Sequence, residues 1–297
     1  MNDNIKKSQG VDSILGDPKK ALWKMSIPLI ISLFITSLYS VIDAIWVSGL
    51  GADALAGVGF VSPIFIALMG IGNGLGAGSA SALSKYIGEE NRQKANNGAI
   101  HTIFITVIIS VITTILLIIF LKDILLGMGA GSTIDYAMDY GMILSIGSIL
   151  VILSNALYGV LRGEGDASRT MYAMLFSSIL NMILDPIFIY GLNLGVKGAA
   201  IATLISLLLV NIMVFYWFYF KKDTYLKPFL SNYKFNKAIT KDILKVGLPA
   251  SLELINNALF AALFSLLLVV VASTDAVAVY STGWRVVTIA TTPIIAI

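Results

Sequence analysis

The chain has 297 residues, of which 57% are hydrophobic and only 12% charged, with 20 lysines and arginines against 17 acidic residues. Soluble domains are usually about 25% charged, so this composition excludes an ordinary soluble protein and indicates an integral membrane protein. The chain has no cysteine, which excludes disulfides, thiolate metal sites and a cysteine nucleophile.

Eight apolar segments follow one another, each long enough to cross a bilayer as a helix, which takes about 20 apolar residues. We expect them at residues 22–47, 53–84, 98–121, 133–160, 170–190, 196–220, 243–271 and 276–297. The polar first 20 residues do not resemble a signal peptide, so the first segment is predicted to be a span. Helices satisfy their own backbone in lipid, which predicts an all-α bundle of about eight transmembrane helices.

Basic residues are concentrated in alternate loops. Of the 20 lysines and arginines, 17 lie in the first 24 residues, in the loops at 85–97 and 162–169, or between 221 and 245, whereas the opposite loops hold only Lys122 and Lys197. Basic loops stay in the cytoplasm. We therefore predict a multi-pass protein of the inner (plasma) membrane with a cytoplasmic N-terminus.

An internal repeat divides the chain. "LWKMSIPLIISL" at the first span resembles "ILKVGLPASLEL" at the seventh, with Pro28 and Pro249 in register, and "GADALAGVGF" resembles "STDAVAVYST" at nearly the same offset. Parallel repeats of six helices are a common transporter plan. We expect an N-terminal lobe at 1–220, a cytoplasmic linker at 221–245 and the start of a second lobe at 246–297, so that the sequence is a truncated form of a longer protein.

Two carboxylates lie inside spans at similar depth. At about 1.5 Å per residue, Asp185 lies about 24 Å beyond Arg169, and Asp43 lies about 28 Å beyond Lys24. Thr203 reaches a similar level, and Asn181 lies one turn before Asp185 on the same helix face. Asp43 also continues a polar stripe of the first span, formed by Ser32, Thr36 and Tyr39. We expect this stripe, including Thr36 and Tyr39, to line a cavity inside the protein.

These groups predict a cation-coupling site. Two carboxylates, an amide, a hydroxyl and the carbonyl that Pro186 leaves without a partner suit a proton or a hard cation such as sodium. Acids inside the membrane usually mark ion pathways. The alternative is that Asp185 only caps or pairs with a neighbouring helix. No cofactor is expected beyond the coupling ion.

The motifs together resemble the multidrug and toxic compound extrusion (MATE) family, prokaryotic branch. The similarity is carried by "SIPLIISLFITSLYSVIDAIWVSGLGADALAGVG", "LRGEGDASR" and "NMILDPIFIYGLNLGVKGAAIATLIS". It implies two six-helix lobes and export of amphipathic, often cationic compounds in exchange for sodium or protons. The resemblance also implies a cation site formed by Asp43, Asn181, Asp185 and Thr203. It implies that Tyr140 and Asn155 line the same lobe and that Pro28 is a hinge.

The family resemblance sets the expected partners. They are small amphipathic molecules and membrane lipids, with no nucleic acid, and the protein is expected to be a monomer. A lipid or lipid-linked oligosaccharide flippase of the same superfamily is the alternative function, although such cavities are usually lined by arginines. A membrane-embedded enzyme is the third possibility, and it would need clustered acids or histidines near one membrane surface, whereas those of this chain are dispersed.

Four further features have competing interpretations. "GIGNGLGAG" (70–78) resembles a dinucleotide fingerprint, but it lies within a span and is expected to serve helix packing. His101 is expected at the membrane interface rather than in a proton relay, and Asp166 is expected to cap the fifth helix. Glu253 and Arg285 are predicted at one depth as a structural ion pair, with a second proton site or an anion-binding arginine as the alternatives.

Overall fold

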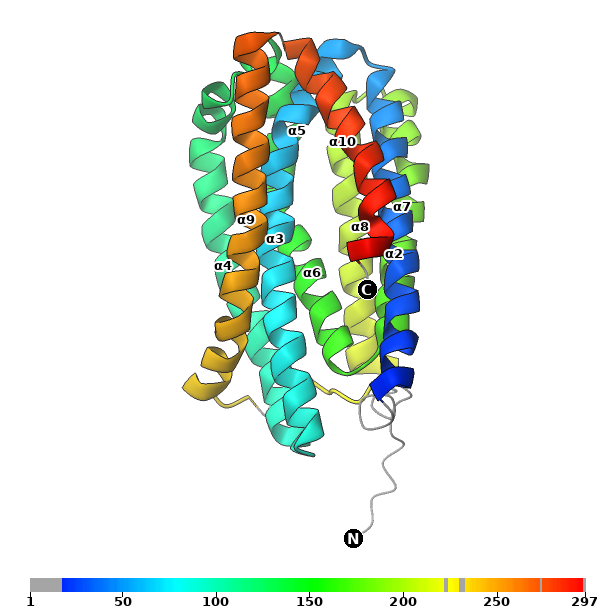
Figure 1. Ribbon diagram of the computed structural model, residues 1–297, viewed down its shortest axis with the longest axis vertical. Coiled ribbons are helices and arrows are strands. Elements are labelled where there is room, and N and C mark those ends of the chain that lie inside the picture. The colour runs from blue at the N-terminus through cyan, green and yellow to red at the C-terminus, as the bar shows by residue number, and fades with distance from the viewer. Residues whose placement is uncertain (1–17, 222–223, 230–232, 273, 296–297) are drawn as a thin grey trace.

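The protein is a bundle of long helices. The computed structural model describes residues 18–221, 224–229, 233–272 and 274–295, and within these ranges it contains no strand. The helices, labelled as in Figure 1, are α2 (Pro18–Ser48), α3 (Ala52–Gly88), α4 (Arg92–Gly127), α5 (Ile134–Ile146), α6 (Ser148–Gly163), α7 (Ala167–Pro186), α8 (Val196–Tyr216), α9 (Lys237–Val271) and α10 (Thr274–Ile295). Short 3-10 or π turns are η1 (Gly131–Thr133), η2 (Ile187–Gly191) and η3 (Trp217–Lys221).

The predicted all-α membrane fold is confirmed. Within the described ranges, six helices are long and apolar enough to cross a membrane, and the count rises to seven if the bent pair α5 and α6 is taken as one span. We predicted that span as one segment at 133–160, but the structure bends it by 55° at Gly147. A Cβ at Gly147 would clash with the side chain of Leu204, so the break allows α8 to approach closely.

Helix α3 lies at the centre of the packing through its alternating glycines. Gly70, Gly74 and Gly78 face α9, where a Cβ would meet residues such as Leu254 and Ser251. Gly72 and Gly76, on another side of the helix, face the α6 backbone around Ile152 to Gly159. The interpretation of this motif as a helix-packing element is therefore confirmed, because both sets of glycines let neighbouring backbones approach.

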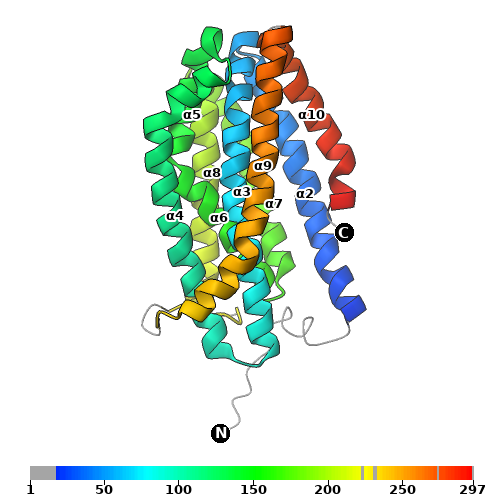
Figure 2. The same ribbon diagram turned by 60° about the vertical axis from the view of Figure 1, so that its left-hand side comes forward.

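The bundle has two sides. Figure 1 shows α3, α4 and α9 on one side and α2, α7 and α8 on the other, and α10 descends beside α2. In the turned view of Figure 2, α3 lies between α4 and α9. Helices α9 and α10, which we assigned to a second lobe, thus pack against α3 and α2 of the first.

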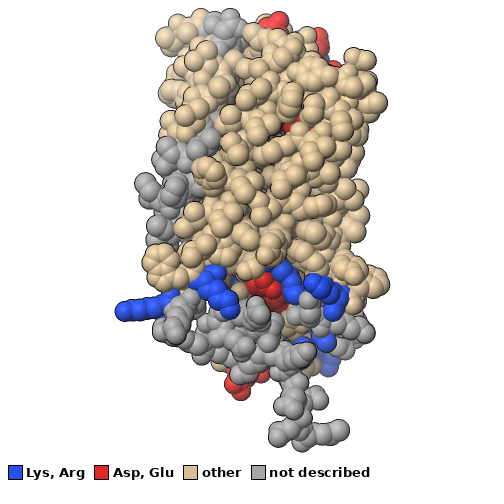
Figure 3. Space-filling model, turned by 90° about the vertical axis from the view of Figure 1, so that its right-hand side faces the viewer, with Lys and Arg blue, Asp and Glu red and all other residues tan. Residues whose placement is uncertain are grey.

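Basic side chains mark one end of the molecule. Figure 3 shows lysine and arginine side chains in a band near the end where the N-terminus lies, below a broad surface without them. Asp166 caps α7 at this end, accepting from the Arg169 N–H at 2.9 Å, as predicted. This distribution matches the alternation of basic loops in the sequence.

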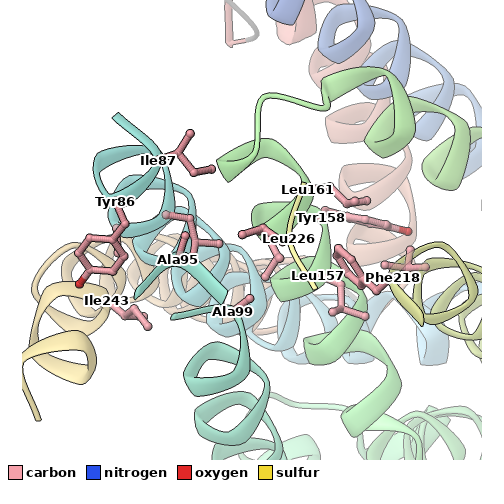
Figure 4. Packing of buried hydrophobic residues seen from close by; sticks show 14 of the residues in the cluster. Tyr86, Ile87, Ala95, Ala99, Leu157, Tyr158, Leu161, Phe218, Leu226 and Ile243 are labelled. Atoms are coloured by element: carbon pink, nitrogen blue, oxygen red, sulfur yellow. The ribbon is translucent and has the colours of Figure 1, made fainter. Parts of the chain in front are cut away.

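The connection from α8 to α9 crosses this basic end. Its residue Leu226 belongs to a buried apolar cluster with Leu157, Leu161 and Phe218 (Figure 4). Side chains of α4 bind its backbone: Arg92 donates to the Tyr225 carbonyl, Asn96 accepts from the Lys227 N–H at 2.8 Å, and His101 Nε2 accepts from the Asn236 N–H at 2.9 Å. The helix after it, α9, begins at Lys237.

Candidate functional site

The four residues predicted for a cation site come from three helices. Asp43 lies on α2, Asn181 and Asp185 lie one turn apart on α7, and Thr203 lies on α8. All four are buried, with exposed fractions of 6% for Asp43 and 0% for Asp185. Helix α7 contacts both α2 and α8, so it stands between the other two contributors.

A hydrogen-bonded chain joins α7 to α8. With the Asn181 amide nitrogen turned to Asp185, it donates to Oδ2 at 2.8 Å, and the amide oxygen accepts from Thr203 Oγ1 at 3.2 Å. Asp43 lies within electrostatic range of Asp185. Two neighbouring carboxylates in a poorly hydrated site repel each other when both are ionised, so a proton or a cation between them is stabilising.

Local sequence explains the shape of α7 at this point. Proline has no N–H to donate and disturbs the regular helical ladder. The α-helix ends at Pro186, and the π-helical turn η2 follows immediately. Such turns are frequent at functional sites. Asp185 is therefore held at the last regular turn before the helix changes its winding.

A cavity of about 480 Å³ adjoins this network. Asp43, Asn181 and Thr203 line it, whereas Asp185 does not reach its wall and lies behind them. The predicted cavity residues all line it as well: Thr36, Tyr39, Tyr140 and Asn155. Thr36 and Asn155 also bond to their own helix backbones, to Ser32 O at 2.9 Å and Val151 O at 2.8 Å. The cavity thus has one carboxylate on its wall and a second one behind it.

The sequence reasoning missed much of the cavity wall. The missed residues are mainly serines, aromatics and methionines: Ser62, Phe65, Met69, Tyr158, Met174, Ser177, Ser178, Ser206, Ser265, Tyr280, Ser281 and Trp284. Helical spacing would have found some of them, because Ser177 and Ser178 lie four and three residues before Asn181 and Ser206 lies three after Thr203. The members on α9 and α10 had no such signal.

Other predicted residues lie outside this cluster. Pro28 lies in the first half of α2, where its carbonyl accepts from Ser32 Oγ at 2.7 Å. Glu253 is exposed on α9, whereas the side chain of Arg285 lies outside the described residues. The ion pair between them remains a prediction.

The ligand chemistry limits which ion could bind. Nowhere in the described ranges do three histidine, cysteine or acidic side chains converge on a metal position. The network instead offers two carboxylates, one amide and one hydroxyl. Oxygen donors of this kind fit a hard cation such as sodium, or a proton, and do not fit a soft transition metal.

Comparisons with known proteins agree on a transporter. A family model described as MatE matches residues 28–187. The multidrug export protein MepA of Staphylococcus haemolyticus is 28% identical over 80% of this chain and 52% of its own, and that of Staphylococcus saprophyticus is 29% identical over 78% and 52%. The chain thus spans about half the length of the curated relatives it matches.

Solved structures give the same answer. A multidrug resistance MATE family transporter of the MOP superfamily in an outward-facing conformation is 38% identical, with a TM-score of 0.90 over 98% of this chain and 65% of its own. A MOP superfamily transporter from Pyrococcus furiosus, whose reverse polarity of binding pocket suggests a different function, gives the same identity, coverage and score. These relatives are transporters, so the alternative of an enzyme is not supported.

Proposed function

Because this chain belongs to the MATE family, we propose that it forms part of a secondary active antiporter that exports small amphipathic or cationic compounds in exchange for sodium or protons. The observation that carries the proposal is the placement of two carboxylates relative to one cavity. Asp43 lies on the wall of the 480 Å³ cavity, and Asp185 lies behind it in the Asn181–Thr203 network.

The coupling follows from electrostatics. When both carboxylates are ionised, the site attracts a proton or a sodium ion, and it also attracts a cationic group in the cavity through Asp43. Binding of the coupling ion neutralises this charge and weakens the attraction for a cationic compound. The two cations therefore compete, as exchange in opposite directions requires.

The wall chemistry favours this substrate class. Aromatic side chains including Tyr39, Phe65 and Trp284 line the same cavity as Asp43, the one charged residue of the described wall. Aromatic faces bind cations and apolar rings alike. A flippase for anionic lipid-linked compounds would need positive charge in the cavity, and the described wall supplies none.

We also infer the orientation and the moving part. The basic end is assigned to the cytoplasm, which places the N-terminus inside the cell, and the protein is assigned as a monomer. Helix α2 bends most easily at Pro28, where no N–H completes the helical ladder. Replacing Pro28 with alanine should slow efflux more than it weakens drug binding; unchanged turnover would argue against a hinge.

The test is efflux by the full-length protein in proteoliposomes, under either an imposed sodium gradient or an imposed pH gradient. Wild-type protein should expel a cationic dye under at least one of them, and that arm identifies the coupling ion. Asp43→Asn and Asp185→Asn should abolish coupled efflux while the protein still folds. Asp53→Asn, an exposed acid at the start of α3, should keep it. Wild-type efflux by both site variants would refute the proposal.

A further inference from the structure

Helix α9 is longer than a membrane span. Its 35 residues extend about 52 Å at 1.5 Å per residue, against a hydrocarbon core of about 30 Å. Its first part splays sideways at the basic end of the bundle (Figure 2). This segment therefore lies where phospholipid headgroups meet the protein.

Three lysines share one face of that segment. Lys237, Lys241 and Lys245 are spaced by four residues and are all exposed. On the opposite face, Ile239 and Ile243 are buried and belong to the apolar cluster that contains Leu226. The lysine face consequently points away from the protein.

The same face becomes apolar further along the helix. At 3.6 residues per turn, four leucines fall within the roughly 80° sector that holds the lysines. They are Leu248, Leu252, Leu259 and Leu263, with exposed fractions between 50% and 62%. Exposed leucines within a span are suited to contact with lipid acyl chains. The three lysines continue the same face toward the end of the helix, so they lie at the level of the headgroups.

No acidic side chain in the described part of the chain pairs with these lysines. The acid nearest in sequence, Asp242, points to α3 instead, where it accepts from Tyr86 at 2.8 Å and pairs with Lys85 at 3.6 Å. The charge of the face is thus left for an external anion.

We propose that the face formed by Lys237, Lys241 and Lys245 binds the headgroups of anionic phospholipids. Topology control accounts for the number of lysines at this end of the molecule, but it does not require three of them on the helix face that carries the four exposed leucines. The combination of a negative headgroup and an acyl chain matches both parts of this face. Phosphatidylglycerol-type lipids satisfy it, and zwitterionic lipids do not.

Native mass spectrometry of the full-length protein tests the proposal by counting retained lipids. With equal phosphatidylglycerol and phosphatidylcholine, the wild type should retain phosphatidylglycerol preferentially. The triple variant Lys237→Gln, Lys241→Gln and Lys245→Gln should weaken that binding by about tenfold or more. Triple replacement by arginine should preserve it, and an excess of inorganic phosphate should not displace the lipid, because phosphate lacks the acyl chain.

A charge-matched control separates the face from net charge. The variant Lys19→Gln, Lys24→Gln and Lys221→Gln removes three charges from other helices of the same end and should bind phosphatidylglycerol as the wild type does. The proposal is overturned if the two triple glutamine variants lose equal affinity, if the α9 variant loses none, or if phosphate alone displaces the lipid. If the triple glutamine variant does not fold, Lys241→Glu is measured in its place. It should lose less affinity for phosphatidylglycerol than the triple variant, and wild-type affinity would contradict the proposal.

Discussion

The seam that α3 forms with α6 and α9 differs sharply from the wall that α2 forms with α7 and α8. Over its most apolar stretch, 56% of the residues of α3 are buried, against 6% for α2. At the seam, glycines bring backbones together, and Gly76 lies against the Gly159 backbone. At the wall, Asp43, Asn181 and Thr203 line one side of a cavity of about 480 Å³, and α3 and α6 close its other side with residues such as Phe65 and Asn155.

The difference shows where polar chemistry is tolerated in this bundle. Close-packed backbones leave little room for side chains, so the seam holds its helices together mainly through backbone contact. The wall has the space that a substrate or an ion needs, and there the Asn181 amide bonds to both Asp185 and Thr203. The proposed transport site therefore lies where close packing ends.

The seam should tolerate no added side chain, and Gly76→Leu should have the largest effect. A Cβ at Gly76 would already lie 2.8 Å from the Asn155 carbonyl and 3.3 Å from Gly159 Cα. Because these contacts are with backbone, the helices would have to separate, which should cost about 3 kcal/mol or more. Thermal unfolding in detergent and the yield of monodisperse protein measure the loss.

Gly88→Ala is the matched control on the same helix, because a Cβ there meets nothing within 4 Å. It should unfold at or slightly above the wild-type temperature, since alanine is favoured over glycine in helices. If Gly76→Leu unfolded like Gly88→Ala, the seam would not be the rigid part of the molecule.

The loop that joins the seam to the wall should make stability depend on pH. Burial raises the pKa of the Glu164 carboxyl to about 8. The hydrogen bond from the Leu226 N–H at 3.0 Å lowers this pKa, but by less than burial raises it. Since the folded state then holds a proton that the unfolded state has lost, the free energy of unfolding falls as pH rises from about 4.5 to about 8. The total should amount to a few kcal/mol.

Replacing Glu164 by glutamine should remove this dependence. The difference in melting temperature between Glu164→Gln and the wild type should grow from pH 5 toward about pH 8 and then stay constant. Glu90→Gln, an exposed acid in the loop between α3 and α4, should follow the wild type. Parallel melting curves for Glu164→Gln and the wild type at every pH would contradict the expected burial effect.

Sequence patterns predicted some features of the seam and of the wall and missed others. Hydropathy located the spans because a bilayer needs a minimum apolar length, and depth along each helix brought Asp43, Asn181, Asp185 and Thr203 to one level. The alternating glycines predicted packing but not their partners. The contacts of α3 with α6 and α9 depend on how helices far apart in the sequence pack together. The spacing of residues within one segment carries no information about that packing.

Three features escaped prediction for physical reasons. The 55° bend at Gly147 lies inside an unbroken apolar run, so hydropathy gives no sign of it. The local sequence gives no sign that Glu164 is buried, because its hydrogen bond comes from Leu226, 62 residues further along the chain. The cavity residues of α9 and α10 become part of the site only through tertiary packing.

The wall should depend on hydrogen bonding more than on close packing, and Asn181→Ala tests this. The change removes the donor to Asp185 and the link to Thr203. Leaving a buried carboxylate without its amide partner should destabilise the protein by about 1–3 kcal/mol, measured by denaturant or thermal unfolding. Asn257→Ala, on the exposed side of α9, should cost less than about 0.5 kcal/mol. Equal losses in the two variants would mean that the network contributes nothing measurable.

The smallest effect is expected at the basic end of the seam, where a polar contact accompanies the glycine packing. Tyr86→Phe removes the hydroxyl that donates to Asp242 at 2.8 Å, but Asp242 keeps its ion pair with Lys85. Because the acceptor retains a partner and the ring still fills its buried position, the loss should be about 1 kcal/mol. Tyr136→Phe, whose side chain is exposed on α5, should change the melting temperature less. If Tyr86→Phe were as damaging as Gly76→Leu, α3 and α9 would be held together by this hydrogen bond rather than by backbone contact, and the contrast between seam and wall would fail.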